Sequence, residues 1–130
     1  MQQNPIGWID LPATDLDRAE KFYKDFFGFE FNRQKEEGGF TMSWFLPMEM
    51  KSYGSGITLM KGEGYEPCHK GPLLYFTAPG ESVKEAIKKA EEQNIKILAP
   101  NRAISAGEHG YFACIEDSEG NKIAIHSMKE

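Results

Sequence analysis

The sequence predicts an α+β fold in which the order strand, helix, strand, strand, strand occurs twice within one domain. Two segments space their apolar residues at helical intervals, short β-type runs surround them, and corresponding segments of the two halves recur at a nearly constant offset. A chain of 130 residues has the size of one domain. We therefore expect residues 1–130 to form one unit of two modules, about 1–62 and 71–130, joined by a glycine-rich connection.

The first half is expected to open with a strand over residues 6–11 and to continue with a helix that begins near Thr14. Thr14 and Asp17 have the spacing of a capping pair, in which a side-chain oxygen accepts a hydrogen bond from a first-turn amide. Gly28 is expected to end the helix, because glycine readily takes the left-handed conformation. Apolar residues at steps of three and four predict one face packed on a sheet: Leu16, Ala19, Phe22, Tyr23, Phe26 and Phe27.

The second predicted helix begins at Ser82, which has the spacing of a capping box with Glu85. Its apolar stripe ends before Asn94 and again occupies one side of the helix. The stripe consists of Val83, Ala86, Ile87 and Ala90. Both helices are therefore expected to lie on one face of a sheet.

Short runs rich in β-branched and aromatic residues predict the strands. Gly, Pro and Asn separate most of them, and residues 37–39 and 117–121 are typical of hairpin turns. The predicted strands cover residues 6–11, 29–34, 40–46, 56–61, 72–77, 95–99, 110–116 and 122–127. Because side chains alternate along a strand, one set is expected under the helices. That set is Ile9, Leu11, Ile57, Leu59, Leu74, Phe76, Ile123 and Ile125.

The two halves can be overlaid at an offset of 65 or 66 residues. Sequence identity between them is low, but three separate pairs of segments agree within one residue of a common offset. The pairs are residues 8–11 with 73–76, 28–31 with 94–97, and 57–59 with 123–125. This agreement indicates an internal duplication rather than two independent domains.

The composition excludes several classes of partner. A net charge of −5, without any basic run, argues against nucleic acid and membrane surfaces. The apolar runs are too short to cross a bilayer, and the start MQQNPIGW lacks the charge and apolar block of a signal peptide, so a cytoplasmic location is expected. Two cysteines, Cys68 and Cys114, do not make a disulfide framework.

Two stretches resemble a known family. Residues 15–23 followed by Phe27-Gly28-Phe29, and residues 117–123, resemble the first helix and the final hairpin of the glyoxalase/bleomycin-resistance/extradiol-dioxygenase group, the vicinal oxygen chelate superfamily, near its lactoylglutathione-lyase-related branch. The resemblance implies two βαβββ modules that curve around a central cleft, often in a homodimer. It also implies that metal-dependent relatives supply one His, Gln or Glu from each of four strands to a metal that acts as a Lewis acid.

The four ligand positions implied by the resemblance fall on Trp8, Thr58, Leu73 and Ala124. None is a good ligand for a divalent ion, so no metal cofactor is expected at these positions. A displaced site built from Asp10, Tyr75 and His126 is the alternative, although catalytic sites need three good protein ligands and tyrosine rarely serves as one.

The side chains on the remaining strand face are expected to line the cleft and to bind a small organic molecule. The expected substrate-binding residues are Trp8, Trp44, Thr58, Met60, Leu73, Tyr75, Lys122 and Ala124. Asp10 is a candidate catalytic group because an inward-facing carboxylate needs a partner or water. His126 is the second candidate, because imidazole titrates near neutral pH and would face Asp10 if the first and last strands lie side by side.

Three functions follow from these residues. The first is a metal-independent glyoxalase-like protein that sequesters a small molecule or catalyses proton transfer with Asp10 and His126. The second is a metal-dependent lactoylglutathione-lyase-like isomerase, or a dioxygenase, with displaced ligands. The third is a non-catalytic dimer or interaction module whose cleft is filled by its own side chains.

Overall fold

The computed structural model describes residues 5–37, 40–45 and 55–130, with side chains for 5–33 and 55–130. The first half forms a sheet in the order β1-β4-β3-β2, in which β1 pairs with β4 in parallel and the other neighbours are antiparallel. Its strands are β1 (Trp8–Pro12), β2 (Asn32–Glu37), β3 (Phe40–Phe45) and β4 (Gly56–Lys61). Helix α1 (Leu16–Phe27) connects β1 to β2.

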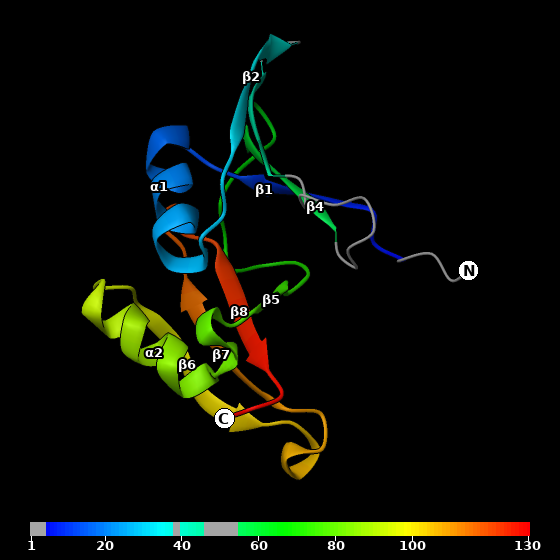
Figure 1. Ribbon diagram of the computed structural model, residues 1–130. Helices are drawn as coiled ribbons and strands as arrows, with labels where there is room; N and C mark the ends of the chain where they lie inside the picture. Colours follow the sequence, from blue (N-terminus) through cyan, green and yellow to red (C-terminus); the bar gives the residue numbers. More distant parts are fainter. Residues whose placement is uncertain (1–4, 38–39, 46–54) are drawn as a thin grey trace.

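The second half repeats this topology with the order β5-β8-β7-β6 and a parallel β5–β8 pair. Its strands are β5 (Tyr75–Thr77), β6 (Ile97–Ala103), β7 (Tyr111–Glu116) and β8 (Lys122–Ser127). Helix α2 (Val83–Glu92) and two short 3-10 turns, η1 (Pro79–Glu81) and η2 (Ser105–Gly107), complete it. The predicted α+β fold with a duplicated βαβββ unit is therefore confirmed, and the helices follow one another along one side of the molecule (Figure 1).

The strand boundaries follow the prediction closely in β4 and β8 and deviate elsewhere. Strand β2 starts three residues later than residue 29, because Phe29 turns back over the helix end, where its amide donates to the Tyr23 carbonyl at 3.2 Å. Strand β6 extends to Ala103 at a sheet edge, with register shifts on both sides of Ala99; the second shift spans Pro100, which has no amide hydrogen to donate. The predicted hairpin at residues 117–121 is confirmed, whereas that at 37–39 includes residues outside the described part of the chain.

The helix ends depend on individual hydrogen bonds. Asp15, and not Thr14 as predicted, is the N-cap of α1, because its carboxylate accepts a hydrogen bond from the Arg18 amide at 3.1 Å. Gly28 ends the helix with φ of 80°, as predicted. Ser82 caps α2 by accepting from the Glu85 amide at 3.3 Å. No helix in the described part of the chain is long and apolar enough to span a membrane.

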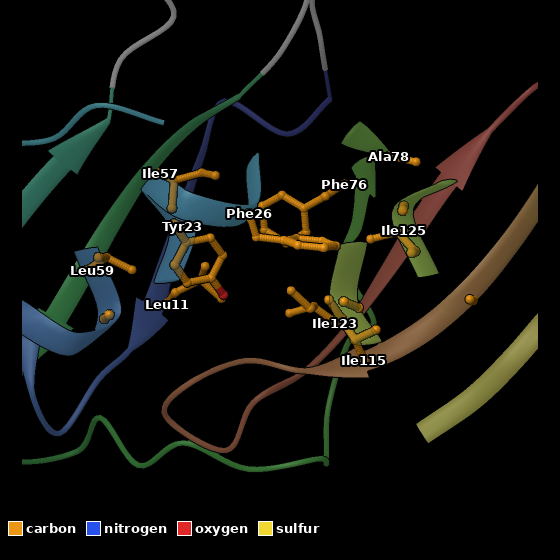
Figure 2. Packing of buried hydrophobic residues seen from close by; sticks show 14 of the residues in the cluster. Leu11, Tyr23, Phe26, Ile57, Leu59, Phe76, Ala78, Ile115, Ile123 and Ile125 are labelled. Carbon is orange, nitrogen blue, oxygen red and sulfur yellow. The ribbon is translucent and has the colours of Figure 1, made fainter. Parts of the chain in front are cut away.

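One apolar core joins the two halves (Figure 2). The predicted core face is confirmed: most of its members are buried under the helices, while Ile9 and Leu74 are partly buried against the cluster. Phe76 of β5 extends into the aromatic side chains around α1, with its ring centre 5.0 Å from that of Phe27 and 5.9 Å from that of Tyr23. The two halves therefore share one buried apolar surface, whose burial favours their association.

The β7–β8 turn fastens the second half to α1 through buried polar groups. The Tyr23 hydroxyl donates to Asp117 at 2.6 Å, and both groups are buried. Burial raises the pKa of Tyr23 well above its ordinary value, and the Asp117 charge raises it further. Asp117 also accepts hydrogen bonds from the amides of Glu119 and Asn121, at 2.9 Å each. Both of its oxygens are therefore hydrogen-bonded within this contact between the β7–β8 turn and α1, called the junction below.

Glu119 is the second acid of this junction, and its side chain is 1% exposed. It accepts hydrogen bonds from the amides of Thr14 and Asp15, at 3.0 and 2.8 Å, and from Arg18 Nε at 2.8 Å. Burial alone raises the pKa of Glu119, but the hydrogen bonds from Arg18, Asp15 and Ser118 outweigh it, so that the pKa falls from 4.5 to about 2. The carboxylate thus stabilises the fold only while it is ionised.

Replacement of Ile125 by alanine tests the shared core. Ile125→Ala is expected to lower the free energy of unfolding by about 2–5 kcal/mol, because it leaves a cavity among closely packed side chains. The exposed Ile6 provides a matched control, since Ile6→Ala is expected to change stability by no more than about 0.5 kcal/mol. Urea unfolding followed by circular dichroism measures both values. Equal effects at the two positions would contradict the core assignment.

Glu119→Gln tests the polar junction through its pH dependence. Because the pKa of Glu119 is lower in the folded state, its contribution is complete above the ordinary value of 4.5 and is lost as the pH falls toward 2. The variant is expected to be less stable by about 1–2 kcal/mol at pH 7, a discounted value because water screens the partly exposed Arg18. Stability measured between about pH 5 and pH 2 should fall less steeply in the variant than in the wild type. Parallel curves would show that Glu119 contributes no ionisation-dependent stability.

Candidate functional site

A hollow of about 240 Å³ lies where the two halves and their connection meet. Strand β1 forms one wall, the start of β8 and the segment before β5 form another, and the connection contributes the rest. Its apolar lining comes from Ile9, Leu11, Pro12, Pro72 and Leu74. Its polar lining comes from Asp10, Cys68, Lys70, Asn121 and Lys122. An apolar surface with a few polar groups is typical of small-molecule sites, and this volume suits a small ligand.

Two larger hollows are less suited to a shared site. One of about 500 Å³ lies outside α1 and the segment before β2, and its lining includes Glu20, Lys24 and Phe29. The other, of about 360 Å³, lies at the end of β8 beside Thr77 and Met128. Each is lined by residues of one half, whereas the 240 Å³ hollow brings both halves together.

Asp10 is the polar centre of the β1 wall. Its Oδ1 accepts a hydrogen bond from Trp8 Nε1 at 3.2 Å, and its Oδ2 accepts from the Tyr65 hydroxyl at 3.1 Å. The bond to Asp10 raises the pKa of the Tyr65 hydroxyl. Sequence reasoning missed Tyr65, because its only local signal is an aromatic residue in a glycine-rich connection.

Trp8 lies across the neighbouring strand. A Cβ atom at Gly56 would lie 2.6 Å from Trp8 Cζ3, so the indole ring fits here only because residue 56 has no side chain. The ring remains partly exposed and donates to Asp10 along the same strand. Trp8 thus covers β4 and orients the carboxylate that lines the hollow.

The predicted residues on β3 and β4 occupy the sheet next to Asp10. Thr58 pairs with Asp10, is 2% exposed, and its hydroxyl has no hydrogen-bond partner among the residues that the structure describes. Met60 pairs with Pro12 and is buried. Trp44 pairs with Thr58 along the backbone, and its side chain lies outside the described residues.

The predicted residues of the second half lie on and beside β8. Lys122 lines the hollow, whereas Tyr75 is 53% exposed and packs its ring 5.8 Å from that of Phe112. Ala124 is buried opposite Tyr75, and Leu73 is half-buried just before β5. Of the nine predicted site residues whose side chains the structure describes, only Asp10 and Lys122 therefore line the shared hollow.

His126 is separated from Asp10. The interpretation that paired them placed the first and last strands side by side, but β1 pairs with β4 and β8 lies between β5 and β7. His126 lines the 360 Å³ hollow, where its Nε2 lies 2.9 Å from the His109 carbonyl oxygen. The expectation that the first and last strands lie side by side is therefore wrong. A catalytic role of either residue remains a prediction.

The connection is held against the second half by several contacts. The Cys68 amide donates to Asn121 Oδ1 at 3.3 Å, and the Lys122 amide donates to the Cys68 carbonyl at 3.3 Å. His69 Nε2 lies 2.6 Å from Glu116 Oε2. These contacts place Cys68 and Lys70 beside the start of β8.

The donor set at the site does not fit a metal centre. Within the described ranges, no three His, Cys, Asp or Glu side chains come together as potential ligands. Asp10 and His126, two members of the proposed displaced set, lie in different hollows and have different partners. The described residues around the hollow therefore do not form a set of ligands for a metal ion.

Comparisons with known proteins agree with the duplicated fold. The family model described as Glyoxalase/Bleomycin resistance protein/Dioxygenase superfamily matches residues 5–125. A glyoxylase-like domain-containing protein from Didymella fabae is 30% identical over 126 residues, which cover 92% of this chain and 91% of the relative.

Solved structures share the fold at lower identity. TnmS3, an antibiotic-binding protein from Streptomyces sp. CB03234, matches with a TM-score of 0.70 at 19% identity and covers 98% of both chains. A glyoxalase I mutant from Zea mays matches with a TM-score of 0.73 at 15% identity over 96% of this chain and 46% of its own. The resemblance carried by the first helix and the final hairpin is thereby confirmed. The chain belongs to the Glyoxalase/Bleomycin resistance protein/Dioxygenase superfamily.

Proposed function

We propose that this protein binds a small organic molecule in the hollow between its two halves, without a metal ion. The observation that carries the proposal is the hollow itself, in which residues from β1, the connection and β8 surround a space of about 240 Å³. Its apolar lining suits the body of a ligand with one or two rings, while Asp10 offers a charged hydrogen-bond acceptor.

Binding is favoured over catalysis by the placement of the two candidate groups. Proton transfer shared between Asp10 and His126 requires both groups within reach of one substrate, and the two residues lie in different hollows. A sequestering role also agrees with the structural likeness to TnmS3, which is described as antibiotic-binding. Proton transfer by Asp10 alone to a ligand in the same hollow is the alternative to sequestration.

A metal-dependent isomerase or dioxygenase is the second candidate, favoured by the likeness to glyoxalase I from Zea mays. It requires metal ligands beyond the described residues that line the hollow, since Asp10 is the only carboxylate among them. The homodimer and the cytoplasmic location expected from the sequence also remain predictions. The exposed Trp8 and Tyr75 would become partly covered if a second copy of the chain packed on these strands.

The binding proposal is tested with 2-naphthol, a neutral two-ring molecule whose hydroxyl can donate to Asp10. Isothermal titration calorimetry is expected to show saturable binding to the wild type. Asp10→Asn is expected to weaken it about tenfold, because a hydrogen bond to a charged acceptor becomes one to a neutral amide. Thermal unfolding should hardly change, since Asp10 is exposed.

Asp25→Asn is the matched control, because this exposed carboxylate pairs with Lys21 on α1 and does not line the 240 Å³ hollow. It should leave the affinity for 2-naphthol unchanged. Absence of saturable binding to the wild type would overturn the proposal. A large loss of thermal stability in Asp10→Asn would instead identify this carboxylate as structural.

Gly56→Ala tests the position of Trp8. The new methyl group is expected to displace the indole ring from β4 and break its bond to Asp10, at a cost of about 1 kcal/mol or less because the ring is partly exposed. In a Trp44→Phe background, the emission of Trp8 should shift to longer wavelength as the ring becomes more hydrated. Gly7→Ala is the control, because a Cβ there meets no atom within 4 Å. An identical emission spectrum in both variants would contradict the described Trp8 position.

A further inference from the structure

We propose that the hollow between the two halves selects organic carboxylates, which Lys70 and Lys122 bind through their ammonium groups. This inference rests on the proposed function and specifies the ligand class of the same site. Both lysines line the hollow, Lys70 from the connection and Lys122 from the first position of β8.

The two lysines have no internal counter-ion. Among the described residues, neither ammonium group has a hydrogen bond or an ion pair within the protein. Glu116 pairs with Lys122 across the strands, yet its carboxylate contacts His69 instead. Asp10 lines the same hollow, and its two oxygens accept from Trp8 and Tyr65. Glu116 and Asp10, the acids opposite and beside the lysines, thus have other hydrogen-bond partners.

The backbone keeps the two lysines beside one another. The Lys122 amide donates to the Cys68 carbonyl, and Cys68 Sγ donates to the Lys70 carbonyl at 3.4 Å. The Cys68 amide is held in turn by Asn121, the residue before Lys122. The chain segment that carries Lys70 is therefore bound to the strand that carries Lys122, and both lysines line the same hollow.

The charge of the lining favours a monoanion. Among the lining residues that the structure describes, two lysines against the carboxylate of Asp10 leave one positive charge in excess, in a protein whose net charge is −5. Charge-assisted hydrogen bonds to a carboxylate are stronger in a hollow that is partly shielded from water than on an open surface. A ligand whose apolar body contacts Leu74 and Pro72 can direct its carboxylate to the lysines.

The experiment compares 2-naphthoate with 2-naphthamide, which have the same ring system and differ in charge. Calorimetry at low salt is expected to show about tenfold tighter binding of 2-naphthoate to the wild type. Lys70→Gln and Lys122→Gln should each weaken 2-naphthoate binding about threefold and leave 2-naphthamide binding unchanged. Raising NaCl from about 20 mM to about 500 mM should reduce the preference for the anion, because salt screens charge pairs that face solvent.

Lys88→Gln is the matched control, since this exposed lysine lies on α2 and does not line the hollow. Equal affinities for the two probes, or an equal effect of Lys88→Gln, would overturn the carboxylate inference. Binding of 2-naphthol would then leave the proposed function standing, whereas failure of all three probes would overturn both. If Lys122→Gln does not fold, Lys70→Gln decides the outcome by itself, because Lys70 lies outside the sheets.

Discussion

The attachment of the β7–β8 turn to α1 is the constraint on which the arrangement of the two halves depends. Apolar contacts around Phe76 hold the halves together, but hydrophobic burial has little directionality. The bonds from Tyr23 to Asp117 and from Arg18 to Glu119 do have direction, and they lie in or beside the core. Both acids need these donors, because a carboxylate removed from water without partners would destabilise the fold. The junction therefore specifies one orientation of the halves.

That orientation also creates the hollow. Strand β1 immediately precedes α1, and β8 immediately follows the turn that contacts α1. The side chain of Asn121 joins the two walls directly, since its Nδ2 donates to the Pro12 carbonyl at 2.8 Å and its Oδ1 accepts from the Cys68 amide. The residues that hold the halves together are thus neighbours in sequence of those that line the hollow.

The acidic and basic groups near the hollow differ in whether they have partners within the protein. Asp117 and Glu119 accept hydrogen bonds from α1 residues at the junction, and Asp10 accepts them from Trp8 and Tyr65. Lys70 and Lys122 remain at the surface of the hollow with long flexible side chains.

The sequence by itself determined the order of the elements, the core-facing residues and the end of α1 at Gly28. These features depend on local periodicity and on the conformational freedom of glycine, which neighbouring residues are sufficient to indicate. Only the tertiary structure decided that Asp15 caps α1. The Thr14 hydroxyl donates its hydrogen bond to Glu119, from the far end of the chain, and the Asp15 carboxylate accepts from the Arg18 amide. It also decided that Tyr65 contacts Asp10 and that His126 lies in another hollow. Contacts between residues distant in sequence depend on how the halves pack, and no local pattern encodes them.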